Sequence, residues 1–184
     1  MPEHPDDLLG SIVTVPESSG VLNIVLHAIY NISCARYSPP FGAIAEAISA
    51  LKVYGVSLHS RLSPPSSLFS LLMSYAPIVP IELYTLAASY DLYEVAAFAS
   101  QYLHSLSLAS LTDDMVMRMG AIYLKRLFFL HYGRVDALKR ILLAPPIPHT
   151  PTLRCDFTDQ TKLTRAWALA SASLAWDARP GELG

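Results

Sequence analysis

The sequence predicts an all-α chain, a multi-helix domain of helical hairpins with at most one or two short strands near the N-terminus. Apolar residues recur at spacings of three and four along most of the chain, which is the period of an amphipathic helix. Serine, threonine or proline stands where several of these segments begin. One β-branched run, residues 11–15, has the pattern of a short strand or extended segment and ends at Pro16. We therefore expect helix in more than roughly half of the residues, against about a third in an average domain.

The composition favours a soluble helical domain with an unusually apolar surface. The 184 residues are enough for one domain with a full core, so we expect one folded unit. Charged residues make up only 15%, below the roughly 25% usual in soluble domains, and apolar residues 52%. This shortage of charge indicates an apolar face that something else covers. The net charge of −2 provides no basic excess for a phosphate backbone, which argues against nucleic acid.

The sequence indicates neither a membrane span nor a secretory signal. The longest uncharged run, residues 62–81, is interrupted by prolines and cannot form one spanning helix. Residues 1–7 are acidic and contain prolines, unlike the basic and then apolar layout of a signal peptide. Cys34 and Cys155 are too few for a disulfide framework, so both are expected as reduced thiols. We expect a cytoplasmic or nuclear protein.

The first two helices are predicted from their caps and their apolar stripes. Ser18 or Ser19 can cap a helix that runs to about Ile32. A second helix follows the break at residues 39–40 and ends at Gly55, which suits a left-handed cap. Apolar residues three or four positions apart form one buried stripe on each helix: Val21, Val25 and Ile29 on the first, and Ile44, Ile48 and Leu51 on the second.

Three shorter helices are expected in the middle of the chain. Residues 63–64, a serine followed by a proline, predict the start of a third helix that ends before Pro77. Pro80 opens a fourth helix. Asp91 begins a fifth, because Glu94 stands three residues later in the manner of a capping box.

The segment from Thr112 to residue 143 is predicted as two or three helices, bent near Gly120 and Gly133. Thr112 is a capping residue, and the carboxylates of Asp113 and Asp114 favour a helix start. Asp113 and Asp114 could also be considered a catalytic pair. Adjacent helix residues point about 100° apart, however, and the helix start already accounts for both carboxylates.

A stiff proline-rich linker and a last helix are expected at the C-terminal end. The linker contains four prolines between residues 145 and 151. The last helix, about residues 158–177, should fold back across the linker and bury Trp167. Its predicted buried stripe contains Leu163, Trp167, Ala170 and Leu174.

The sequence contains no pattern typical of catalysis or of a cofactor site. It has no glycine-rich phosphate loop, G-x-S-x-G elbow, H-E-x-x-H or EF-hand pattern. His149 and Cys155 form the nearest approach to a metal-ligand pair, but a zinc site needs three or four donors. The simpler interpretation is that both pack the linker against the helices. We therefore predict no catalytic residue, no cofactor and no metal.

One stretch departs from the nearly neutral character of the chain. It contains the basic residues Lys125, Arg126, His131, Arg134, Lys139 and Arg140. A basic helix can bind acidic partners or nucleic acid. Because leucine, isoleucine and phenylalanine are interleaved with these charges, the stretch is better interpreted as the solvated face of a buried helix.

Several segments resemble fungal BTB/POZ-domain proteins. Residues 15–30, which end Leu26-His27-Ala28-Ile29-Tyr30, look like the BTB stretch "L-L-x-x-I-Y", and residues 43–56 look like the following helix, which ends in "Y-G-V/L". Further segments are similar to the helical extension of basidiomycete members of the family: residues 80–92, 122–131, 145–149 and 163–170. The resemblance covers most of the chain from about residue 12 onward.

The family's N-terminal half, with its three-stranded sheet and its "H-K-x-x-L" helix start, has no counterpart in this sequence. The resemblance implies a non-enzymatic protein–protein interaction module, an adaptor or scaffold. It does not carry over the usual homodimer, and cullin binding is possible by resemblance only. The alternative function is a helical domain that binds a small apolar ligand or lipid between its helices.

The absent half leads to one prediction about an interface. In the full family domain the first two helices pack partly against the sheet, so we expect their apolar surface to self-associate or to bind an obligate partner. The candidate interface residues are Val21, Val25, Ile29, Ile44, Ile48 and Leu51. The expected organisation is an extended segment (1–16), the BTB-like helices with their extension (17–144), the linker (145–157), the C-terminal helix (158–178) and a tail (179–184).

Overall fold

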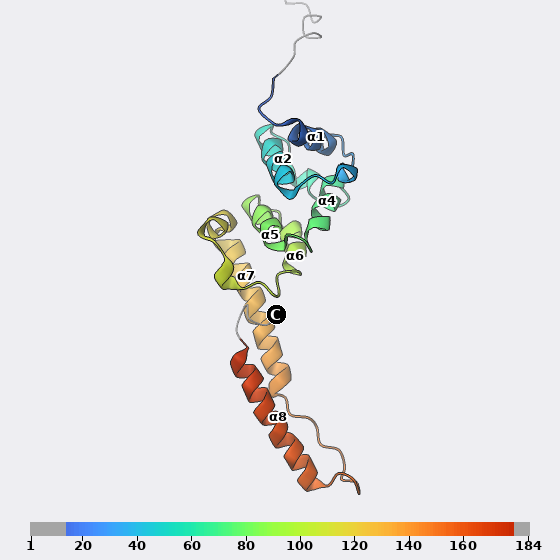
Figure 1. Cartoon of the computed structure of the whole chain (residues 1–184), viewed down its shortest axis with the longest axis vertical. Coiled ribbons are helices and arrows are strands. Elements are labelled where there is room, and N and C mark those ends of the chain that lie inside the picture. Colours follow the sequence, from blue (N-terminus) through green and yellow to red (C-terminus); the bar gives the residue numbers. More distant parts are fainter. Residues whose placement is uncertain (1–13, 179–184) are drawn as a thin grey trace, which may run out of the picture. The chain divides into compact units, whose positions relative to one another are not determined.

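The computed structural model describes residues 14–178, and these residues form eight α-helices and no strand (Figure 1). The predicted all-α class is confirmed, and helix covers well over half of the described residues. The strand expected at residues 11–15 lies largely outside the described residues, and Thr14 and Val15 have no regular structure. The helices are α1 (Ser19–Ile29), α2 (Phe41–Val53), α3 (Leu58–Arg61), α4 (Ser67–Tyr75), α5 (Pro80–Ser89), α6 (Tyr93–Ser100), α7 (Asp113–Leu143) and α8 (Phe157–Asp177).

The chain divides into two compact units, Met1–Leu71 and Leu72–Gly184, where its length predicted one. Chain length limits the size of a core but not the number of cores. The helices pair with near neighbours in sequence: α1 with α2 in the first unit, and α5 with α6 and α7 in the second. Each unit can therefore bury its own apolar stripes.

In the first unit, α1 begins as predicted, because the Ser18 Oγ accepts a 3.4 Å hydrogen bond from the Val21 N–H. It ends at Ile29, earlier than the expected Ile32, since Asn31 adopts a left-handed backbone with φ of 54°. The Asn31 side chain then accepts a 2.9 Å hydrogen bond from the Ser67 N–H. Helix α2 is followed by Gly55 with φ of 73°, the predicted left-handed cap.

Most of the candidate interface residues on α1 and α2 are buried within the first unit. Val25 is 1% exposed and Ile48 0%, and Val21, Ile44 and Leu51 are buried as well. Ile29, the sixth member of the set, is half-buried. The two stripes are buried where α1 packs on α2, so they form the core of this unit and offer no surface to a partner.

Helix α4 begins three residues after the predicted start at residues 63–64. Ser66, rather than Ser63, caps it, since the Ser66 Oγ accepts a 3.2 Å hydrogen bond from the Phe69 N–H. The same hydroxyl donates to the Arg61 carbonyl oxygen at 2.6 Å. The two prolines between Ser63 and Ser66 therefore belong to the turn before the helix and not to its first turn.

In the second unit, α5 begins at Pro80 as predicted, and Leu83, Tyr84 and Ala87 are buried. The predicted capping box at Asp91 and Glu94 is wrong. Helix α6 begins at Tyr93, and its N-cap residue makes no side-chain hydrogen bond to the helix. Asp91 instead takes a left-handed backbone, with φ of 54°.

Helix α7 begins as predicted, because the Thr112 Oγ1 accepts a 3.3 Å hydrogen bond from the Met115 N–H. The expected bend at Gly120 is confirmed by its φ of 69° and ψ of 168°, values that glycine adopts without strain. The second expected bend is wrong, since the helix continues unbroken through Gly133. Every fourth residue of the long part faces the core, beginning with Met119 and continuing with Tyr123, Leu127, His131 and Val135.

Helix α8 folds back beside α7 and runs antiparallel to it, as expected (Figure 1). Its predicted stripe is not the packing face, because Trp167 is 37% exposed and Leu163, Ala170 and Leu174 are exposed too. The buried positions are small or polar, namely Gln160, Ser171 and Ala178. The Gln160 Nε2 donates a 2.9 Å hydrogen bond to the His149 carbonyl oxygen, so the linker covers one end of α8. Hydrophobicity alone thus selected the wrong face.

Candidate functional site

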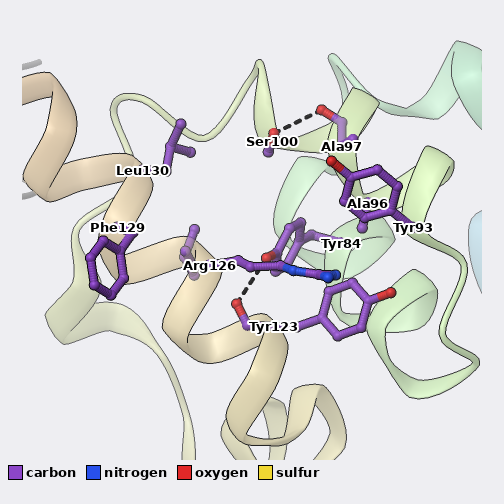
Figure 2. A pocket seen from close by; sticks show the side chains of 10 residues that line it. Tyr84, Tyr93, Ala96, Ala97, Ser100, Tyr123, Arg126, Phe129 and Leu130 are labelled. Atoms are coloured by element: carbon purple, nitrogen blue, oxygen red, sulfur yellow. Dashed lines mark hydrogen bonds between the residues drawn. The ribbon is translucent and has the colours of Figure 1, made fainter.

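A pocket of about 370 Å³ lies among α5, α6 and α7 of the second unit (Figure 2). Its volume falls within the range of small-ligand and side-chain sites. We call it the Arg126 pocket, because it contains one charged side chain among aromatic and small residues. The lining residues are Tyr84, Tyr93, Ala96, Ala97, Ser100, Tyr123, Arg126, Leu127, Phe129 and Leu130.

Two buried tyrosines connect α5 to α7 at this pocket. The rings of Tyr84 and Tyr123 meet edge to face, with centroids 6.1 Å apart and an interplanar angle of 75°. The Tyr84 hydroxyl donates a 2.9 Å hydrogen bond to the Tyr123 carbonyl oxygen. Burial raises the pKa of Tyr84 to about 12, against a smaller lowering effect of the Arg126 charge. The phenol is therefore neutral at physiological pH.

The Tyr123 hydroxyl is held by the turn between α5 and α6. It donates a 2.7 Å hydrogen bond to the Asp91 Oδ1. Burial raises the pKa of Tyr123 to about 12, and the hydrogen bond to Asp91 and the negative charge of that carboxylate raise it further. The ring is thereby fixed by packing on one side and by a charge-assisted hydrogen bond on the other.

Arg126 is one turn after Tyr123 on α7, and its guanidinium lies between two aromatic rings. The guanidinium carbon is 4.9 Å from the centroid of the Tyr93 ring and 4.8 Å from that of the Tyr123 ring. Figure 2 shows the side chain reaching between these rings. Within residues 14–178, no carboxylate lies at ion-pair distance from this guanidinium. Its charge is therefore balanced by π faces and not by an anion.

The only hydroxyl nucleophile that a serine could offer in this pocket has no base beside it among the described residues. The one serine of the pocket, Ser100, donates to the Ala97 carbonyl oxygen at 2.7 Å, and no histidine lines the pocket. A serine nucleophile needs a base within hydrogen-bond reach. The pocket instead presents a guanidinium beside apolar walls, which is a combination that can hold an oxyanion attached to an apolar group.

A second hollow lies next to the first on α7. We call it the aromatic groove; it has a volume of about 390 Å³ and is lined by Leu108, Phe128, Phe129 and Tyr132. Phe129 lines both the groove and the Arg126 pocket. Lys125 lies over the same ring, with its Nζ 5.6 Å from the centroid. The groove is thus apolar and bordered by a cation.

The basic residues of this stretch do not form one patch. Arg134 donates to the His104 carbonyl oxygen, and Arg140 pairs with Asp136 at 2.9 Å on the exposed side of α7. His131 is 1% exposed, and its Nε2 has no hydrogen-bond partner among the described residues. Burial lowers the pKa of His131, and the charges of Arg134 and His104 lower it further. The interpretation as a solvated helix face describes Lys125, Arg126 and Arg140, which are exposed, but not His131, which is buried.

His149 and Cys155 belong to the same linker, and within the described residues neither is part of a ligand cluster. Thr152 and Cys155 form an isolated antiparallel bridge, and the His149 Nδ1 is 2.6 Å from the Thr150 carbonyl oxygen. In the part of the chain that the structure describes, no three His, Cys, Asp or Glu side chains are placed to hold a metal ion. Cys34 is buried and Cys155 half-buried, and both are free thiols.

Sequence reasoning missed the Arg126 pocket, because tyrosines at helical spacing are usually core residues. One usable signal was the three-residue spacing of Tyr123 and Arg126 on a predicted helix, which places a guanidinium over a ring. The contribution of Tyr93 and Tyr84 depends on how α5 and α6 pack on α7. That packing has no local sequence pattern.

No helix among residues 14–178 has the length and hydrophobicity needed to cross a membrane. Comparison of the chain with protein-family models, with curated proteins and with solved structures found no match.

Proposed function

We propose that this chain is a non-enzymatic protein–protein interaction module of the BTB/POZ type, serving as an adaptor or scaffold. The observation that carries the proposal is a cluster of exposed aromatic side chains on α7. Phe128 is 49% exposed, Phe129 62% and Tyr132 65%, and all three line the aromatic groove. The resemblance of the sequence to BTB/POZ proteins supports the same class of function.

Exposed aromatic clusters of this kind are typical of surfaces that bind proteins. Contiguous apolar patches beyond a few hundred Å² are rare on soluble monomers and mark interaction sites. Aromatic residues and arginine are enriched at the centres of protein interfaces, where they contribute much of the binding energy. The aromatic groove combines three aromatic rings with Lys125 over one of them, and Arg126 lines the adjoining pocket.

The second candidate function is a site for a small apolar ligand or lipid, and the almost purely apolar walls of the aromatic groove favour it. A ligand pocket usually buries most of its ligand. The exposure of Phe128, Phe129 and Tyr132 is the argument for a protein partner instead, because a small ligand would leave much of that aromatic surface in water.

Photo-crosslinking in cells separates the two functions. We would replace Phe128 by p-benzoylphenylalanine and irradiate, with the same replacement at Met117 as the control, since Met117 is exposed on the same helix but outside the groove. We expect one protein adduct at Phe128, lost when Phe129→Ser is added, and none at Met117. A lipid adduct at Phe128, or equal protein adducts at both positions, would contradict the proposed function.

A further inference from the structure

We infer that the partner presents an acidic peptide segment, with its carboxylate in the Arg126 pocket and a neighbouring apolar side chain in the aromatic groove. The inference rests on the proposed function, because it assigns the chemistry of the protein partner. Three observations carry it: a guanidinium stacked on two rings with no carboxylate at ion-pair distance among residues 14–178, the local balance of charge, and the shared wall of the two hollows.

The first observation is the preorganised guanidinium. The rings of Tyr93 and Tyr123 lie over Arg126, with distances of 4.9 Å and 4.8 Å from the guanidinium carbon to their centroids. Stacking occupies the faces of a guanidinium and leaves its N–H edge for hydrogen bonds in the plane. A carboxylate is the planar group that accepts two such bonds at once. Holding the side chain between rings also reduces the rotamer entropy lost on binding.

The second observation is the balance of charge around the pocket. Among residues 14–178, no carboxylate neutralises Arg126, and the Asp91 carboxylate accepts the Tyr123 hydroxyl at 2.7 Å. Lys125 adds a second positive charge over Phe129. Tyr84 and Tyr123 are neutral at physiological pH, since the pKa of each is raised to about 12. An incoming carboxylate therefore meets the charges of Arg126 and Lys125 and no ionised phenol, while the two phenol protons stay donated to the Tyr123 carbonyl oxygen and to Asp91.

The third observation is the position of Phe129, whose ring belongs to both hollows. An occupant of one hollow is therefore in contact with the wall of the other. Successive side chains of an extended peptide point to opposite faces, so a carboxylate and an apolar side chain two positions apart, about 6.6 Å along the chain, can enter the two hollows together. The apolar walls of the groove suit a leucine or phenylalanine side chain.

A phosphate-bearing macromolecule fits the same observations less well. Tracking a nucleic acid backbone requires a row of cations, whereas the pocket holds one arginine and the whole chain carries a net charge of −2. An aromatic groove can also stack unpaired bases, but such stacking sites accompany a groove of several cations that tracks the backbone. A peptide carboxylate next to an apolar residue uses both features.

Fluorescence anisotropy with synthetic peptides tests the inference. The probes are fluorescein-labelled, N-acetylated hexapeptides with one glutamate two positions from a leucine and from a phenylalanine, and the same peptides with glutamine in place of glutamate. We expect the glutamate peptides to bind the full chain about tenfold more tightly, the factor for a charge-assisted hydrogen bond of roughly 1.4 kcal/mol. Added salt should reduce this preference.

Two variants with the same change of net charge localise the effect. Arg126→Gln should abolish the preference for glutamate. Arg140→Gln should leave it intact, since Arg140 pairs with Asp136 on the exposed side of α7. Arg126→Lys should give an intermediate preference, because an ammonium keeps the charge without the planar pair of donors. Circular dichroism melting of each variant checks that the helices remain folded.

Three results would overturn the inference: equal binding of the glutamate and glutamine peptides to the parent chain, an equal effect of Arg126→Gln and Arg140→Gln, or displacement of the peptide by oligouridine. The first comparison uses the parent chain alone, so it holds even if a variant misfolds. If the peptides show no preference while the Phe128 crosslink to a protein persists, the proposed function stands and the carboxylate site fails.

Discussion

The Tyr123 hydroxyl of α7 donates a 2.7 Å hydrogen bond to the carboxylate of Asp91, the residue that turns the chain between α5 and α6. Asp91 holds a left-handed backbone with φ of 54°, a conformation that aspartate tolerates better than most residues. This contact ties the α5–α6 hairpin to the long helix at the edge of the Arg126 pocket. The same hydrogen bond engages the carboxylate that was predicted to cap α6. Asp91 therefore does not cap that helix.

Removal of this hydrogen bond should destabilise the second unit modestly. Tyr123→Phe leaves the ring in place and deletes the donor, which should lower the free energy of unfolding by about 1 kcal/mol. Asp91 is exposed and water can replace the donor, so a larger loss is not expected. Urea unfolding followed by circular dichroism measures the effect. Tyr93→Phe is the control, since Tyr93 is exposed, and an equal loss in both variants would contradict the prediction.

Two tyrosines should titrate abnormally at high pH. The pKa of Tyr84 and that of Tyr123 are each about 12 in the folded chain, against an ordinary value near 10. The folded state therefore keeps protons that the unfolded state loses, so this stabilisation is complete below pH ~10 and is lost as the pH rises through about 12. Tyrosinate absorbance should show a late step that Tyr84→Phe with Tyr123→Phe removes. A single step near pH 10 would argue against buried phenols.

His131 should make the second unit sensitive to acid. Its folded pKa lies below the ordinary value of about 6.5, because burial and the charges of Arg134 and His104 disfavour the imidazolium. The unfolded state therefore binds a proton at a higher pH than the folded state does. The stability that depends on a neutral His131 is complete above the ordinary pKa of about 6.5 and is lost as the pH falls through the folded pKa. His131→Leu should flatten the dependence of melting temperature on pH between roughly 7 and 5.

The control for this prediction is His59→Leu, because His59 is exposed in the first unit. It should leave the pH dependence of melting unchanged. A parent chain whose melting temperature is constant over this range would show that His131 keeps its ordinary pKa, against the buried environment described for it.

Truncation of Trp167 should cost less than full burial would imply. The indole is 37% exposed, so Trp167→Ala should lower the free energy of unfolding by about 1 kcal/mol, the usual effect of a partly buried residue. Leu127→Ala, at a position that is 1% exposed on α7, should cost roughly 2 to 5 kcal/mol. Chemical denaturation of both variants measures the difference. Equal losses would place Trp167 in a closed core.

Charged substitutions in α1 and α2 should unfold the first unit and not dissolve an oligomer. Val25→Glu and Ile48→Glu each put an unpaired carboxylate into a closed core, which costs several times the usual mutational effect of about 1 kcal/mol. Val53→Glu is the matched control, since Val53 is exposed on the same α2 helix. Circular dichroism with light scattering separates the outcomes. If Ile48→Glu gave a folded monomer, this prediction would be wrong. The face would then be an interface, against what its burial indicates.

Local sequence patterns predicted the helices and several of their ends, because these depend on neighbouring residues. Ser18, Thr112 and Pro80 act at the helix starts expected for them, and Gly55 and Gly120 have the positive φ that their positions suggested. The errors arose where a distant residue competes with a neighbour. Asp91 was predicted to form a capping box with Glu94, three residues later. Its carboxylate instead accepts a hydrogen bond from the hydroxyl of the distant Tyr123.

The apolar stripes of the first unit were located correctly, although they were also predicted as an interface, whereas the packing face of α8 was not located, for a physical reason. On α1 and α2 the apolar stripe and the packing face coincide. On α8 the face that packs on α7 and the linker contains Gln160 and Ser171. The buried Gln160 amide donates a hydrogen bond to the His149 carbonyl oxygen, which offsets the cost of burying it. The Arg126 pocket was unpredictable for a related reason, since three helices contribute to it and only Tyr123 and Arg126 share one.

The pairing of helices with near neighbours along the chain bears on how fast the protein folds. Apart from α5 with α7, the main packing partners are consecutive in the sequence: α1 with α2, α5 with α6, and α7 with α8. Such contacts close short loops, and chains in which local contacts dominate fold quickly. Each hairpin can form before the others are complete. The Arg126 pocket also requires α7 to pack on α5, so we expect it to assemble after the helices that line it.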